Sequence, residues 1–322
     1  MRKARKENRL IRNAVILMVS LMPLYAELPL QASNLASPAY WGMAHSGTAL
    51  NTVRNAYWLN PALGSYDHPY VINLNEAFLP GKGISFTELS GHYILGKSML
   101  QGGINYENYG SFDARDDEGI IRGTFTAAQY QCFAGYAQRI TERFSAGIHL
   151  VLFGNRIDVS RENMLFIRYG FSYTFGKRDN MLAFSATTDG KSQRWRAAFS
   201  HELEYMPLRL NIDFRWYGDD YYPGIFLNET EYRFDFGAAA RYFADKLALG
   251  AYIRVSEDLN LMAGFDLARL NMRTNAFGLD TMLSGLALGA RYRFRQLEFN
   301  LAMYHYANFT TMSALGISYI GK

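Results

Sequence analysis

Apolar and polar residues alternate strictly along much of the chain. From Leu208 to Trp216 every even position is apolar and every odd position is charged or an amide. From Ser284 to Arg295 apolar side chains again fill every second position, opposite small residues and three arginines. A period of two places alternate side chains on opposite faces of a strand, whereas a helix would spread both sets around its circumference. The pattern therefore predicts an all-β chain.

Fifteen segments carry this alternation, and the connections between them are short and long in turn, which is typical of up-and-down outer-membrane barrels. We expect long connections at 110–121, 158–163 and 189–194. An even strand number keeps both termini on one side, so we assign 231–243 to an outer loop and predict a transmembrane antiparallel barrel of about fourteen strands. Because 231–243 alternates as well as any other segment, a hairpin above the barrel or a different count stays open. The candidates are 70–78, 84–95, 99–109, 122–138, 144–156, 163–175, 181–188, 195–206, 208–217, 231–243, 246–255, 259–271, 284–295, 297–306 and 311–320.

Alternation alone also fits a soluble β-sandwich, whose apolar face would meet a protein core instead of lipid. Two features favour the barrel. An exported sandwich of this size is usually stapled by disulfides, and this chain has one cysteine. Aromatic residues also gather near predicted strand ends, as in the girdles of membrane barrels. These aromatic residues are Tyr106, Tyr109, Tyr136, Phe175, Trp195, Trp216, Tyr217, Tyr304 and Tyr306.

The N-terminal region lacks the alternation. Residues 1–26 combine six basic side chains with an apolar run from Ala14 to Ala26, which predicts a secretory signal peptide cut at Ala26 or as late as Ala32. An uncleaved amphipathic anchor is the alternative. Residues 27–69 hold four of the eight prolines and are predicted to form a plug in the lumen, since an empty barrel of this size would be a water channel. The barrel is then expected over 70–322.

Composition and motifs argue against an enzyme. Beyond residue 26 the chain has 27 basic and 28 acidic residues, so net charge gives no support for nucleic-acid binding. No spacing of histidines and the single cysteine suggests a metal site, and no cofactor is expected. The segment Gly91 to Ser98 matches a phosphate-binding loop literally, but its interior is bulky and the following residues alternate as a strand.

Two charged sets remain as candidate sites. Acidic residues in the predicted outer loops are candidates for binding a partner or a divalent cation, although solvated loop acids are the favoured interpretation. Arginines on predicted lumen faces are candidates for anion selection or for ion pairs with Asp213, Glu298 and plug residues. The loop acids are Asp113, Asp116, Asp117, Glu118, Asp219 and Asp220, and the lumen arginines are Arg209, Arg215, Arg291, Arg293 and Arg295.

A family resemblance is carried by the predicted plug and the first strands. Gly42 and Met43, followed by the triplet Asn60, Pro61 and Ala62, are similar to the opening of FadL-like outer-membrane barrels. The segments 108–113, 118–127 and 143–148 resemble the PorQ branch of the PorV/PorQ family. Where that family often has an acidic pair between the two plug motifs, this chain has Val53 and Arg54.

The resemblance implies a non-enzymatic outer-membrane barrel of the type IX secretion system. Its partners would be outer-membrane lipid, lipopolysaccharide and the proteins of the surface complex that attaches secreted substrates. The alternative is a FadL-like channel for hydrophobic small molecules. An apolar lumen pocket near Gly102 and Gly103 with a gap in the wall would favour transport, whereas a sealed polar lumen and a broad outer platform would favour anchoring.

Overall fold

The computed structural model describes most of the predicted barrel and part of the predicted plug. The described residues are 36–51, 53–64, 66–176, 180–188, 193–217, 227–228, 233–234, 243–268, 283–306 and 310–321. The predicted signal peptide lies outside them. Within these ranges, no helix is long and apolar enough to cross a membrane.

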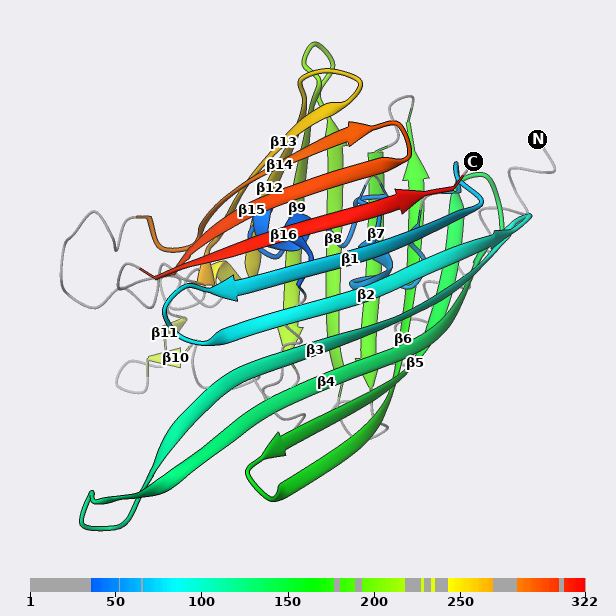
Figure 1. Cartoon of the computed structure of the whole chain (residues 1–322). Coiled ribbons are helices and arrows are strands. Elements are labelled where there is room, and N and C mark those ends of the chain that lie inside the picture. The colour runs from blue at the N-terminus through cyan, green and yellow to red at the C-terminus, as the bar shows by residue number, and fades with distance from the viewer. Residues whose placement is uncertain are drawn as a thin grey trace.

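The described strands close into an antiparallel barrel of fourteen, in which each strand pairs with its neighbours in the chain and β1 pairs with β16 (Figure 1). This confirms the predicted fold class and strand number. The barrel strands are β1 (Tyr70–Leu79), β2 (Ile84–Leu95), β3 (Ser98–Arg115), β4 (Ile121–Arg139), β5 (Phe144–Ile157), β6 (Ser160–Phe175), β7 (Asn180–Thr188), β8 (Gln193–Glu202), β9 (Leu208–Tyr217), β12 (Leu247–Arg254), β13 (Leu259–Asp266), β14 (Leu286–Phe294), β15 (Leu297–Tyr306) and β16 (Thr310–Ile320).

The described residues of the segment that left the strand count open lie outside the barrel wall. Its residues Arg233–Phe234 form β11, which pairs with β10 (Leu227–Asn228) in a separate two-stranded sheet. Strand β9 pairs directly with β12, so the chain between them returns to the wall without adding a strand. The assignment of 231–243 to an outer loop is therefore confirmed for the residues that the structure describes.

Alternation along the strands separates two faces of the wall. On β15, Leu301 and Met303 are more than half exposed and point outward, whereas Glu298 and Tyr304 are buried and point into the lumen. A barrel in lipid is expected to have apolar side chains on the outside and polar or aromatic side chains on the inside. Three of the aromatics predicted at the outer girdle, Tyr109, Tyr304 and Tyr306, instead belong to the inner face, because their positions have the inward parity.

The two ends of the barrel differ. We call the end with the connections at 96–97, 140–143, 203–207, 255–258 and 295–296 the turn end, and the opposite end the loop end. Residue 70 begins β1 and Ile320 ends β16 at the turn end. Figure 1 shows the β3–β4 and β5–β6 hairpins reaching beyond the rest of the wall at the loop end.

These hairpins correct two of the predicted loops. Gly110 lies in a β-bulge between Asn108 and Ser111, where the register of β3 against β4 shifts, and the strand continues to Arg115. Asp158 has a left-handed φ of 55°, which closes a tight turn between Ile157 and Ser160. The predicted connections 110–121 and 158–163 are therefore largely strand.

The described N-terminal residues, 36–51 and 53–64, lie inside the barrel, and we call them the inner segment (Figure 1). They contain the helix α2 (Pro38–Gly42) and the 3-10 helix η1 (Ala56–Trp58). Nearly all of their side chains are buried, in two clusters shared with wall residues. The lumen is therefore filled by its own chain.

Candidate functional site

Inward-facing glycines receive the inner segment. Asn60 lies over Gly170 of β6, and Pro61 lies over Gly147 of β5, so closely that a Cβ at either glycine would overlap the segment. On the opposite side of the barrel, Gly289 of β14 is in contact with Gly42. A glycine leaves room for backbone to approach closely, so these positions explain how the segment fits a lumen of this width.

Asp213 of β9 binds the backbone of the inner segment. Its carboxylate accepts hydrogen bonds from the amides of Gly47 at 3.3 Å and Thr48 at 3.1 Å, and from the Thr48 hydroxyl. Asn211 donates to the same carboxylate at 2.8 Å. The side chain is fully buried, so these donors replace the water that the charge has lost.

A second buried carboxylate, Asp266 of β13, links the segment to β9. Arg215 binds it with two hydrogen bonds, of 2.5 and 3.2 Å, and Nδ1 of His45 lies 3.4 Å from it. His45 has a left-handed φ of 67° and its ring is stacked between Tyr40 and Tyr304, at centroid distances of 4.6 and 4.7 Å. His45 of the segment is thus held by its contact with the Asp266 carboxylate and by stacking.

Rings continue from His45 toward the loop end of the lumen. Trp41 contacts Phe86 of β2 and Tyr304 of β15 at centroid distances of 6.3 and 5.5 Å. Tyr109 and Tyr306 extend this group along β3 and β15, which both approach the loop end. We call Tyr40, Trp41, His45, Phe86, Tyr109, Tyr304 and Tyr306 the aromatic cluster.

The space beside Gly103 is also filled. Trp58 packs edge-on against Phe133 of β4, with their ring centroids 4.4 Å apart. A Cβ at Gly103 would lie within 3 Å of both rings. Arg168 of β6 donates to the Trp58 carbonyl at 2.6 Å, and Gln101 of β3 donates to the carbonyls of Pro61 and Leu63. Gly102 faces outward. The pocket and wall gap that would favour transport are therefore absent from this described part of the barrel.

Polar side chains dominate the lumen near the turn end. Glu298 of β15 lies 3.3 Å from Nε of Arg54 and 3.8 Å from Nε of Arg291, and the Arg291 guanidinium lies 5.1 Å from the centre of the Tyr252 ring. These residues surround a narrow polar pocket between the segment and the wall. Arg54 thus takes part in an ion pair across the lumen.

Tyr57 completes the polar contacts on the β1–β2 side. Its hydroxyl donates to Ser90 Oγ at 3.0 Å and accepts from Asn73 at 2.9 Å. Complete burial raises the pKa of Tyr57 above its ordinary value, so this hydroxyl stays protonated at neutral pH and keeps its donor role.

All five predicted plug residues lie within the inner segment. Asn60 donates to the Phe171 carbonyl at 3.1 Å and accepts from the Ala62 amide at 3.0 Å. Pro61 and Gly42 meet wall glycines, while Met43 and Ala62 are almost fully buried. Sequence reasoning missed the wall residues that hold them, because an inward glycine or glutamine elsewhere in the chain carries no sign of its partner.

The predicted lumen arginines divide into two groups. Arg209, Arg215 and Arg291 face inward and pair with Glu202, Asp266 and Glu298, which agrees with the expected ion-pair role. Of these partners only Glu298 was expected, since the expected Asp213 binds the inner segment instead. Arg293 has the same inward parity and is more exposed, near the turn end. The prediction that Arg295 faces the lumen is wrong. Arg295 lies in the β14–β15 turn with a φ of 57°, where its side chain is exposed and outside the lumen.

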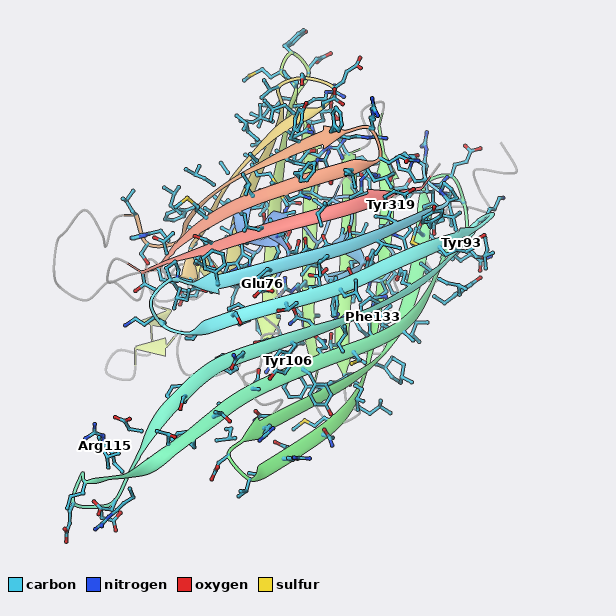
Figure 2. The ribbon with its side chains drawn as sticks, in the orientation of Figure 1. Glu76, Tyr93, Tyr106, Arg115, Phe133 and Tyr319 are labelled. Carbon is cyan, nitrogen blue, oxygen red and sulfur yellow. The ribbon has the colours of Figure 1, made fainter. Side chains whose placement is uncertain are left out.

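The predicted loop acids of the β3–β4 hairpin lie apart from the lumen. Asp113 pairs with Arg115, and Asp116 pairs with Arg122, at the tip of the β3–β4 hairpin, where Figure 2 labels Arg115. Asp117 and Glu118 are exposed in the same turn. Asp219 and Asp220 lie outside the described residues. Within the described ranges, no three His, Cys, Asp or Glu side chains are grouped to hold a metal ion.

Solved structures similar to this chain include hydrocarbon channels. The chain is similar to the Pseudomonas putida toluene transporter TodX, at 11% identity and a TM-score of 0.57, over 88% of this chain and 96% of that one. It is similar to the monoaromatic hydrocarbon channel CymD, at 13% identity and a TM-score of 0.60, over 90% and 99%. No protein-family model and no curated protein matches the sequence. The assignment to the PorV/PorQ family gains no support from these comparisons, whereas a FadL-like outer-membrane barrel fits them.

Proposed function

We propose that this chain is a FadL-like outer-membrane channel for small hydrophobic molecules, not an enzyme. The likeness in fold to TodX and CymD, which covers almost the whole of both channels, supports the proposal. The observation that carries it is the aromatic cluster, which places a continuous set of rings inside the barrel on the side of the loop end.

The position of the cluster suits uptake from outside. In outer-membrane barrels the longer loops face the exterior and the short turns face the periplasm. A hydrophobic solute entering at the loop end would exchange water for aromatic surface, at a gain of about 25 cal/mol per Å² buried. The polar pocket around Glu298 follows at the turn end, where the solute is released.

The inner segment acts as the plug in this proposal. It fills the lumen and is held by hydrogen bonds from β3, β6 and β9, so the structure corresponds to a closed state. Passage requires part of the segment to leave the wall.

Uptake of a radiolabelled aromatic hydrocarbon by cells with and without the protein tests the function. We expect faster uptake with the native protein, and slower uptake when Trp41→Ala and Tyr304→Ala remove rings from the cluster. Asp117→Ala at the exposed hairpin tip is the matched control and keeps the native rate. Equal uptake by cells with and without the barrel would contradict the proposal.

A second candidate is the anchoring of a surface protein complex, as expected of type IX secretion barrels. Two observations favour it: the space beside Gly103 is filled, and the β3–β4 hairpin protrudes beyond the wall (Figure 1). Affinity capture of the tagged barrel from detergent-solubilised outer membranes distinguishes the two functions. Recovery of secretion-system subunits supports anchoring, and recovery of bound hydrophobic molecules alone supports transport.

A further inference from the structure

The apolar belt on the outside of the barrel is shorter along the strands at the β16–β1 pair than on β9 and β14. On β9, outward positions from Leu208 to Trp216 are all apolar, and on β14 the same holds from Phe294 to Leu286. These runs cover about 26 Å of strand at ~3.3 Å per residue. They match the ~25 Å apolar band of outer-membrane barrels once strand tilt is allowed for.

At the β16–β1 pair the run is half as long. Counted from the turn end, outward residues are apolar from Tyr319 to Leu315 on β16 and from Tyr70 to Leu74 on β1, about 13 Å of strand. The next outward residue is Ser313 on β16 and Glu76 on β1. Six residues from the turn end, β9 and β14 instead carry Phe214 and Leu288.

The outward residues above this short belt form one patch, which is polar except for Phe78. Glu76 is directly opposite Thr87 of β2, whose hydroxyl donates to its carboxylate at 2.6 Å. Phe78 is opposite Ser85 on one side and Ser313 on the other, with its ring outward among them. Figure 2 shows Glu76 on the front of β1, some way from Tyr319 at the turn end. We call Glu76, Phe78, Ser85, Thr87 and Ser313 the seam patch.

Hydrocarbon is an unfavourable environment for this patch. A carboxylate facing lipid costs free energy at mid-depth and little near the headgroups, so the patch is stable if headgroups descend to meet it. Its chemistry selects among headgroups. A carboxylate repels phosphate but accepts hydrogen bonds from sugar hydroxyls, and an aromatic ring beside it packs against the C–H face of a sugar ring.

We propose that the seam patch binds the sugar headgroup of an outer-leaflet glycolipid and thins that leaflet beside β16, β1 and β2. The inference rests on the proposed placement of the barrel in the outer membrane. It adds a lipid-binding surface at the position where the first and last strands of the barrel meet, on the opposite face of the wall from the plug.

Depth measurement by spin labelling tests the thinning. In a Cys132→Ser background, labels are placed at Ser313→Cys and Thr87→Cys, with Phe214→Cys and Leu288→Cys as controls on the tall side of the belt. The measurement compares how strongly a water-soluble nickel complex and lipid-soluble oxygen relax each label, in phosphatidylcholine vesicles that contain a digalactosyl lipid. We expect the nickel complex to relax the labels at positions 313 and 87 more strongly than oxygen does. At positions 214 and 288 we expect oxygen to be the stronger relaxant. Oxygen dominance at all four sites would overturn the inference. Nickel access at all four would overturn the membrane placement itself.

Lipid retention tests the choice of headgroup. Native mass spectrometry of barrels extracted from vesicles of phosphatidylcholine, phosphatidylglycerol and the digalactosyl lipid measures which lipid stays bound. We expect the galactolipid to be retained, and at least ~5-fold less of it with Glu76→Leu, because a charged hydrogen-bond acceptor is lost. Tyr292→Phe, which removes an outward hydroxyl from β14, serves as the control and retains the native amount. Preferential retention of phosphatidylglycerol, or no effect of Glu76→Leu, would overturn the proposal.

Discussion

At the scale of single residues, the position of the inner segment depends on buried carboxylates that bind it. We expect Asp213→Asn to weaken the hold on residues 47–48, because the amide keeps the shape but loses the charge that strengthens three hydrogen bonds. The free energy of local opening at residues 47–48 should fall by about 2 kcal/mol. The rate of amide hydrogen exchange there should therefore rise ~30-fold. Hydrogen exchange of the detergent-solubilised barrel measures this change.

The control for that variant is Asp258→Asn, which changes an exposed carboxyl in the β12–β13 turn. It should leave exchange at residues 47–48 unchanged. Native exchange in Asp213→Asn would mean that the neighbouring stacking of His45 alone holds the segment.

Adjacent glycines on β3 give a sharper test of packing in the lumen. Gly103→Ala places a methyl within 3 Å of Trp58, Phe133 and Ser90, and we expect it to destabilise the barrel by about 1–3 kcal/mol. Gly102→Ala adds the same methyl on the outer face, where the nearest atom is the Phe133 carbonyl oxygen at 3.6 Å, and should cost little. Urea unfolding in micelles compares the two, and equal stabilities would contradict the close packing at Gly103.

At the scale of the element, the β3–β4 hairpin has an acid at its tip that sets its pH range. The backbone amide of Ile120 donates to Asp116 at 2.8 Å and Arg122 donates at 2.7 Å, and these bonds hold the pKa of Asp116 below its ordinary 3.8. A lowered folded-state pKa means that the turn is favoured above the ordinary value and lost as the pH falls through the lowered one.

Nuclear magnetic resonance of the Ile120 amide during acid titration checks this expectation. The midpoint should lie below 3.8, and Asp116→Asn should remove the transition. Asp117→Asn, which changes an exposed acid in the same turn, should leave the midpoint unchanged. A midpoint at or above the ordinary aspartate value would show that these hydrogen bonds do not form in solution.

Strand identity and number could be predicted from sequence because a period of two is visible without any knowledge of partners. The lengths of the hairpins could not. Gly110 reads as a turn residue but lies in a bulge, and Arg295 continues an alternating run but takes the left-handed conformation that closes a turn. Each depends on the pairing register, which is a property of two strands and not of one.

At the scale of the whole molecule, the site was less predictable than the wall. The sequence indicated that residues 27–69 belong in the lumen, and residues 36–51 and 53–64 of this range lie there. The sequence did not indicate that Asp213, Asp266 and Arg168 bind the inner segment. The alternating pattern is the same whether an inward polar residue contacts water, a neighbouring strand or the inner segment. Closure of the barrel brings together residues that are more than a hundred positions apart.

Because the barrel closes through strand pairing alone, the wall should form without the inner segment. All fourteen strands pair with one another through backbone hydrogen bonds, so a variant lacking residues 36–64 should still form a barrel, though a less stable one. Its lumen would be a continuous water-filled path lined by Asp213, Asp266, Glu298 and inward arginines. Single-channel recording in planar bilayers should therefore show a large steady conductance that the native protein lacks. A variant whose β3–β4 hairpin is shortened beyond Gly110 removes chain outside the lumen and should stay closed. If the variant without residues 36–64 also stays closed, the outer loops and not the inner segment seal this barrel.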